Sequence, residues 1–176
     1  MRVLITGCAR SGTLYIAKVL EALGLDVSRE QLGAEHVVSW RDVGGQFDVV
    51  LQQVREPLAT IGSCQTIRKE SWDHACAYVP IDRQAPLLAR CAEFWYYWNL
   101  RCRGMAHWVY RIEDLPKVWN TFRVWVGASK ATYAQAAHIP RMMNHRKHSE
   151  VTWGDIEKAT PLCDEIRRLA ESYGYR

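Results

Sequence analysis

The sequence predicts an α/β fold, a three-layer αβα domain with a central, mainly parallel sheet. Two observations lead to this prediction. Short apolar segments typical of buried strands alternate with longer segments whose apolar residues recur at helical spacing. The chain also opens on a strand, a glycine-containing turn and a helix, in the order from which parallel sheets are built. Because its 176 residues contain no linker or internal repeat, we expect a single domain over residues 1–176.

The first half of the chain supplies three of the expected strands. Residues 2–6 are the first, and the helix after the following turn has one apolar face and ends at Gly24. A second strand is expected near residues 26–28 or 36–38. The run 48–54 is short, apolar and β-branched, which indicates a third strand.

Helices are expected to follow the third strand. Pro57 suits the first position of a helix, which we expect to continue to about Arg68. Residues 69–83 are expected to be irregular. From about Ala85 to Arg103 apolar and aromatic residues recur at helical spacing, which indicates a long helix packed in the core.

The last third of the chain completes the alternation. Residues 107–112 are the expected fourth strand and residues 115–126 the helix after it. Residues 128–151 are polar and basic and are expected to be mostly loop. One last helix is expected to begin near Thr152, because Asp155 three residues later gives a capping pattern.

Composition limits the classes of function. A net charge of +4 suits an anionic ligand but is too small to argue for nucleic acid. No apolar run is long enough to span a membrane, and no signal peptide precedes the first strand. The six cysteines form no C-x-x-C pair, so we expect reduced and mostly buried thiols in a cytoplasmic protein.

The turn at residues 7–13 carries the clearest chemical signal. Backbone N–H groups at the start of a helix have no intrahelical partner, and the helix dipole adds positive charge there, so the turn predicts a phosphate site. The spacing Gly7-x4-Gly12 matches the start of a Walker A loop, but Thr13 stands where the lysine should be. Arg10 is the side-chain cation inside this P-loop-like turn.

Residues 9–15, Ala-Arg-Ser-Gly-Thr-Leu-Tyr, resemble the 5′-phosphosulfate loop of sulfotransferases. In that family the loop binds 3′-phosphoadenosine 5′-phosphosulfate (PAPS). The resemblance implies that Arg10 binds the phosphosulfate and assists departure of the phosphate, and that Tyr15 stacks near the adenine. Leu14 replaces a family threonine and keeps only its backbone N–H. The cofactor-binding residues implied in this loop are Gly7, Arg10, Ser11, Gly12, Thr13, Leu14 and Tyr15.

Two further segments are similar to the same family. Arg55 precedes a proline by two residues and Ser63 by eight, a spacing at which sulfotransferases bind the 3′-phosphate. A guanidinium and a hydroxyl suit phosphate oxygens. Arg146 and Lys147 stand where cytosolic members close an R-K-G segment over that phosphate, although His148 replaces the glycine.

The resemblance also implies a catalytic base between the first helix and the Arg55-bearing strand. Residues 33–40 are faintly similar to a G-H-E…S-W stretch of bacterial members, which makes Glu35 and His36 the candidates. Both side-chain types serve as general bases that take a proton from a hydroxyl or an amine.

The sequence therefore predicts a sulfotransferase that moves a sulfuryl group from PAPS to a small-molecule or glycan acceptor. Neither a membrane nor nucleic acid is an expected partner. No metal is expected, because His145 and His148 have no third ligand nearby. Two alternatives stay open: a nucleotide-binding P-loop protein without sulfotransfer activity, and a degenerate P-loop kinase.

Overall fold

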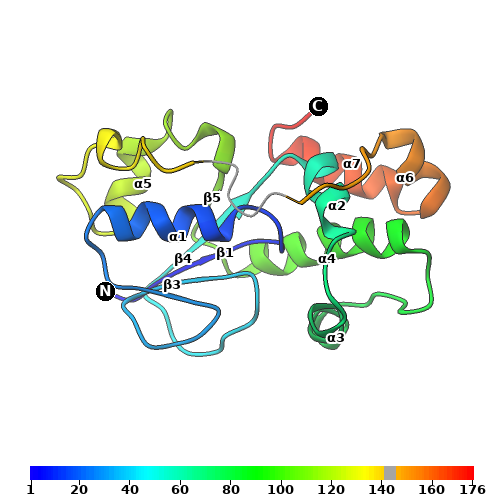
Figure 1. Ribbon diagram of the computed structural model, residues 1–176, viewed down its shortest axis with the longest axis horizontal. Helices are drawn as coiled ribbons and strands as arrows, with labels where there is room; N and C mark the ends of the chain where they lie inside the picture. Colours follow the sequence, from blue (N-terminus) through cyan, green and yellow to red (C-terminus); the bar gives the residue numbers. More distant parts are fainter. Residues whose placement is uncertain (141–145) are drawn as a thin grey trace.

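A computed structural model describes residues 1–140 and 146–176 and confirms the α/β fold (Figure 1). Five strands form one all-parallel sheet in the order β2-β3-β1-β4-β5. The strands are β1 (Val3–Thr6), β2 (Val27–Arg29), β3 (His36–Ser39), β4 (Val49–Val54) and β5 (Trp108–Arg111). Both segments proposed for the second strand are thus strands.

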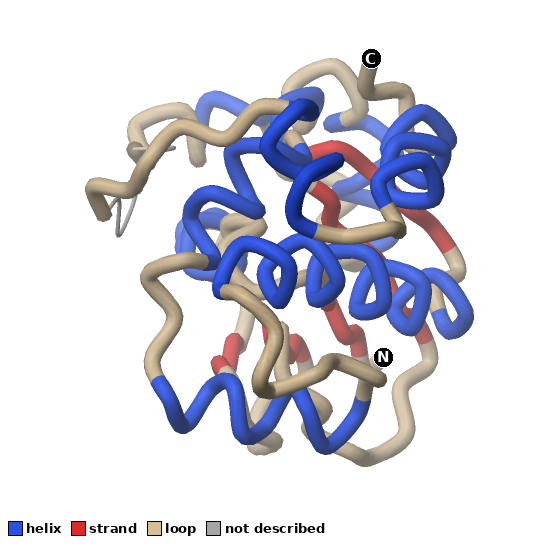
Figure 2. The backbone as a smooth tube through the Cα atoms, turned by 90° about the vertical axis from the view of Figure 1, so that its right-hand side faces the viewer, coloured by secondary structure: helices blue, strands red, loops and turns tan. Residues whose placement is uncertain are grey.

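Seven helices are described: α1 (Thr13–Ala22), α2 (Pro57–Cys64), α3 (Lys69–Tyr78), α4 (Leu87–Met105), α5 (Trp119–Trp125), α6 (Trp153–Ala159) and α7 (Cys163–Ser172). Short 3-10 turns occupy Ile112–Asp114 and Tyr133–Gln135. Figure 2 shows the strands enclosed between helices. No helix in the described part of the chain is both long and apolar enough to cross a membrane.

The two faces of the sheet are covered by different helices. Ile5 and Leu51 pack with residues of α1 and α5 in one apolar cluster. The side chains of the residues next to them on each strand point to the opposite face of the sheet. On that face the side-chain amide of Gln52 donates to the backbone oxygen of Asn99 on α4 at 3.0 Å. Helix α4 in turn packs with α2, α3, α6 and α7 around a second cluster, so the sheet is the middle of three layers.

Two helix predictions in the middle of the chain are wrong. Helix α2 ends at Cys64, and residues 69–78 form α3 rather than an irregular segment. Trp72 and Ala75 of α3, three residues apart, are buried against the cluster around α4. This burial stabilises a short helix whose sequence is otherwise polar.

The helices near the end of the chain also differ from expectation. Helix α5 begins only at Trp119, because residues 112–114 form a 3-10 turn and residues 115–118 continue as turn. The predicted last helix is two helices separated at Thr160, whose backbone is extended (φ −145°, ψ 145°). Pro161 follows it and disfavours a helical conformation in the preceding residue. The capping pattern of Thr152 with Asp155 is confirmed in α6.

The prediction that the cysteines are unpaired and mostly buried is confirmed. All six cysteines are free thiols, and five of them are buried. Burial raises the pKa of the Cys8 thiol well above its usual range, with the neighbouring Cys64 adding to the effect. Cys8 packs in the core beneath the turn.

Candidate phosphate-binding site

The turn after β1 and the arginine after β4 lie at the same end of the sheet. β1 and β4 are parallel neighbours in which Thr6 is paired with Gln52, so both strands end at the carboxyl edge. Figure 1 shows the loop that leads into α1 beside the start of α2. In parallel α/β sheets ligands bind beyond this edge.

The loop between β1 and α1 needs glycine at two positions. A Cβ on Gly7 would lie 2.3 Å from the backbone oxygen of Gln53, which leaves no space for a side chain. Gly12 adopts a left-handed conformation (φ 95°), and a Cβ there would lie 2.8 Å from Ile112 Cδ1. Arg10 is also left-handed (φ 69°), so the backbone curls into a concave turn at the N-terminus of α1.

Gln53 supports the loop from below, a role that the sequence did not reveal. Its side-chain amide donates to the backbone oxygen of Ser11 at 2.7 Å and accepts from the Tyr110 hydroxyl at 3.0 Å. Gln53 is fully buried. Two consecutive glutamines in an otherwise apolar strand were the signal, because a buried amide must find partners.

Three arginines meet above the loop. Arg10 Nε donates to the Ser63 hydroxyl at 2.9 Å, and Arg55 Nη1 donates to the backbone oxygen of Arg10 at 3.2 Å. Arg146 Nη1 donates to the backbone oxygen of Thr66 just beyond α2 at 3.0 Å. The structure therefore brings together residues that the sequence assigned to three separate motifs.

A cavity of about 610 Å³ opens over this cluster. Its volume lies within the range of sites for small ligands and cofactors. Burial lowers the pKa of Arg10, and the positive charges of Arg146 and Arg55 lower it further. An anion placed among these arginines would relieve their mutual repulsion. The described lining includes six arginines: Arg10, Arg29, Arg41, Arg55, Arg68 and Arg146.

The remaining loop residues divide between cavity and core. Thr13 and Leu14 line the cavity with Gly12. Tyr15 instead is 2% exposed and packs in the cluster beneath α1, so its ring is not presented to a ligand as the resemblance implied. The Ser11 hydroxyl is buried without a hydrogen-bond partner among the described residues.

The basic segment before α6 is only partly placed at the site. Arg146 lines the cavity, as does His148, whose ring lies so close to α2 that a Cβ on Gly62 would be 2.9 Å away. Lys147 is exposed and does not line the cavity. His145 lies outside the described residues.

The structure does not bring Glu35 and His36 to the phosphate loop. β3 begins at His36, which is paired with Val3 at the start of β1, so both candidates lie at the amino edge of the sheet. His36 is buried with Nε2 2.9 Å from the backbone oxygen of Val126, and Glu35 is exposed near the chain's N-terminal amine. This placement corrects the expectation that either takes a proton at the loop.

Glu30 is the carboxylate that lines the described part of the cavity, and it was not among the residues predicted from the sequence. It directly follows β2 and adopts a left-handed conformation (φ 58°), which is uncommon for a residue other than glycine. Burial raises the pKa of its carboxyl, although the Ser39 hydroxyl 3.2 Å away and Arg41 3.8 Å away oppose the shift. Its place immediately after a parallel strand was the available signal.

Comparisons of the chain with known proteins give no match. No family model matches the chain, and no curated protein or solved structure matches it.

Proposed function

We propose that the chain is a sulfotransferase that moves a sulfuryl group from PAPS to a hydroxyl or amine of an acceptor. One observation carries the proposal: a glycine-dependent loop at a helix N-terminus, three converging arginines and a single described carboxylate line the same cavity. The resemblance of residues 9–15, and of Arg55 with Ser63, to sulfotransferase motifs supports the same assignment.

The two phosphate groups of PAPS would have separate partners. The N–H groups at the start of α1 and the Arg10 guanidinium suit the 5′-phosphosulfate. Arg55 and Ser63 suit the 3′-phosphate, with Arg146 beside them. The hydrogen bond from Arg10 to Ser63 keeps these two groups of residues adjacent, as a single nucleotide would require.

The transfer step needs positioning and a base. The acceptor oxygen or nitrogen attacks the sulfur, the bond from sulfur to the bridging phosphate oxygen breaks, and the charge left on that phosphate is stabilised by Arg10. The acceptor proton passes to Glu30. Because burial raises the pKa of Glu30, its carboxylate is a stronger base than an exposed glutamate.

The end of β4 favours sulfuryl transfer over a kinase. Kinases and related nucleotidases hold Mg²⁺ with a carboxylate near such a strand end, whereas this strand ends in Gln53, Val54 and then Arg55. The Gln53 side chain is engaged in supporting the loop. Thr13 stands at the position of the Walker lysine.

Ligand titration tests the proposal. Calorimetry without Mg²⁺ should show adenosine 3′,5′-bisphosphate binding at least roughly tenfold more tightly than AMP or ATP, since two sites for phosphate are filled. Arg55→Ala should remove this preference. Arg168→Ala, which changes an exposed arginine on α7, is the matched control. Equal affinities for AMP and the bisphosphate would contradict the 3′-phosphate assignment.

Turnover separates the enzyme from a nucleotide-binding protein without activity. We expect sulfated product from PAPS and a suitable acceptor, and loss of product in Glu30→Gln with bisphosphate affinity retained. Tight bisphosphate binding without product across a broad panel of alcohols and amines would favour the binding protein.

A further inference from the structure

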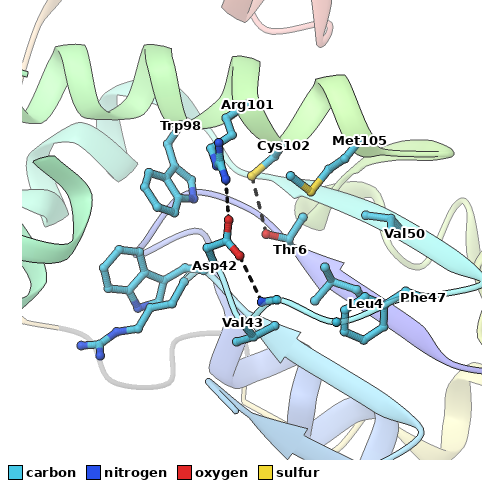
Figure 3. Close-up of a pocket in the computed structure, with 14 residues that line it drawn as sticks. Leu4, Thr6, Asp42, Val43, Phe47, Val50, Trp98, Arg101, Cys102 and Met105 are labelled. Carbon is cyan, nitrogen blue, oxygen red and sulfur yellow. Dashed lines mark hydrogen bonds and ion pairs between the residues drawn. The ribbon is translucent and has the colours of Figure 1, made fainter. Parts of the chain in front are cut away.

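A second cavity, of about 260 Å³, lies on the opposite face of the sheet from α1 (Figure 3). Its walls are β1, β4, the last turns of α4 and the loop that follows β3. The side chains that point into it are mostly apolar: Leu4, Val43, Phe47, Val50, Trp98 and Met105. An engineered apolar cavity of about 150 Å³ already binds benzene, so this one has room for a ring with a substituent.

The charged groups of this cavity are each paired with a neighbouring residue. Asp42 forms an ion pair with Arg101 and accepts a hydrogen bond from the backbone N–H of Gly44 at 3.0 Å (Figure 3). Thr6 Oγ1 lies 3.6 Å from the Cys102 thiol. The Arg101 guanidinium holds down the pKa of Asp42 against the effect of burial. Asp42 and Arg101 neutralise each other, and Arg41, the other charged residue in the wall, is paired with Glu30 3.8 Å away, so the cavity suits an uncharged ligand.

Two residues form a wall that the apolar cavity shares with the phosphate cavity. Trp40 and Arg41 line both of them. The Trp40 ring packs edge-on against Phe94, with their ring centroids 5.9 Å apart, and the Arg41 guanidinium lies over the Trp40 ring, 5.3 Å from its centroid. Ser39, the residue before Trp40, places its hydroxyl 3.2 Å from Glu30. Trp40 and Arg41 therefore stand between the apolar cavity and the cavity that contains Glu30, the carboxylate proposed as the base.

We propose that this cavity holds the apolar body of the acceptor, whose hydroxyl or uncharged amine extends past Trp40 toward Glu30. The acceptor is then a compact, largely apolar molecule and not a glycan. This inference rests on the proposed sulfotransferase function. A ring or alkyl group gains about 25 cal/mol for each Å² removed from water. A sugar would instead have to give up hydration of several hydroxyls against Leu4 and Val50, where nothing replaces those hydrogen bonds.

The test uses cyclohexylmethanol as an apolar alcohol and glucose as a polar one, each titrated by ligand-observed NMR with adenosine 3′,5′-bisphosphate present. Met105→Trp adds bulk at the rim of the cavity, where Met105 is 42% exposed. Leu100→Trp makes a similar change at a position on α4 that is 39% exposed and does not line the cavity. Val43→Trp blocks the opposite wall.

We expect cyclohexylmethanol to bind and to be sulfated, and glucose to do neither. Met105→Trp and Val43→Trp should each weaken alcohol binding roughly tenfold or more by filling the cavity, with Leu100→Trp unchanged. Bisphosphate affinity should be the same in all three variants, which also shows that they are folded. Equal alcohol binding in Met105→Trp and Leu100→Trp, or glucose binding as well as the alcohol does, would overturn the proposal.

Failure of the proposed function would give a different result. If the wild-type chain bound cyclohexylmethanol in a Met105-dependent way but did not bind the bisphosphate, the nucleotide assignment and the acceptor role would both be overturned. If both ligands bound and the alcohol was not sulfated, the acceptor role alone would be overturned.

Discussion

The two edges of the central sheet carry similar residue types but differ in what those residues can do. At the carboxyl edge, Glu30 and Arg10 line one cavity beside the N-terminus of α1. At the amino edge, Glu35 is exposed and His36 is buried in a hydrogen bond with a backbone oxygen. In an all-parallel sheet, the position of a titratable residue along its strand therefore decides whether it can reach the site.

The pairing register of β3 with β1 shows how far the amino edge lies from the loop. β3 begins at His36, opposite Val3, and ends at Ser39, opposite Thr6, the last residue before the loop. At about 3.3 Å per residue, the start of β3 is roughly 10 Å from the edge where the loop lies. The same reasoning applied to β2 selects Glu30, which follows its last residue.

The largest expected effect separates two arginines at the carboxyl edge. Under the proposed function, Arg10→Ala should lower kcat by roughly 2–4 kcal/mol of transition-state stabilisation, because Arg10 is the residue proposed to stabilise the charge that develops on the departing phosphate. Arg55→Ala should mainly raise KM for PAPS, because the 3′-phosphate does not change during the reaction. Steady-state kinetics of both variants checks this, and the reverse pattern would show that their roles are exchanged.

The next largest effect compares carboxylates at the two edges. Glu30→Gln should lower kcat by a factor on the order of 10² with bisphosphate affinity retained, as expected for loss of a general base. Glu35→Gln should have wild-type kinetics, since Glu35 lies at the amino edge. A loss of turnover in Glu35→Gln alone would mean that the amino edge takes part in the reaction.

The same carboxylate should determine the pH dependence. Only ionised Glu30 accepts a proton, and burial raises its pKa. The kcat of the wild-type enzyme should therefore rise with pH through a pKa above that of an ordinary glutamate. The rise should be absent from the residual activity of Glu30→Gln, measured over the same pH range.

The sequence was enough to predict what depends on local patterns. The strand, turn and helix at residues 2–24, the glycines of the loop and the spacing of Arg55 from Ser63 are contiguous features. The all-parallel sheet confirms the fold class. Glu35 and His36 were expected at the loop and lie at the amino edge instead. The segment 26–39 forms two strands, and deciding which of its residues lie at a carboxyl edge requires knowing that both strands form.

Tertiary packing accounts for other features that local patterns could not give. Tyr15 follows the loop in sequence, but its ring packs under α1 with residues of the sheet. Helix α3 forms because its Trp72 meets residues of α4 that are distant in the chain. The apolar cavity combines Thr6 and Val50 with Met105, which no single segment of sequence brings together.

A smaller effect should appear in stability at the amino edge. His36→Leu should lower the free energy of unfolding by about 1–3 kcal/mol, because it leaves the backbone oxygen of Val126 without its buried partner. Urea unfolding measures the loss. Bisphosphate affinity of the folded variant should be unchanged, and a parallel loss of affinity would mean that the amino edge influences the loop.

The smallest effect is a gain in stability at the carboxyl edge. Burial raises the pKa of Glu30 in the folded chain, so the folded state holds this proton more tightly than the unfolded state. Stability therefore falls as pH rises from the unfolded pKa through the raised folded pKa, and the full cost of burying the charge is present above it.

Glu30→Gln removes that cost. Its urea midpoint should exceed the wild-type value at about pH 8 and converge with it toward about pH 3, where the wild-type carboxyl is protonated in both states. A destabilised Glu30→Gln at the higher pH would mean that the ion pair with Arg41 outweighs the burial of the charge, and that the carboxylate is held there for stability instead of for chemistry.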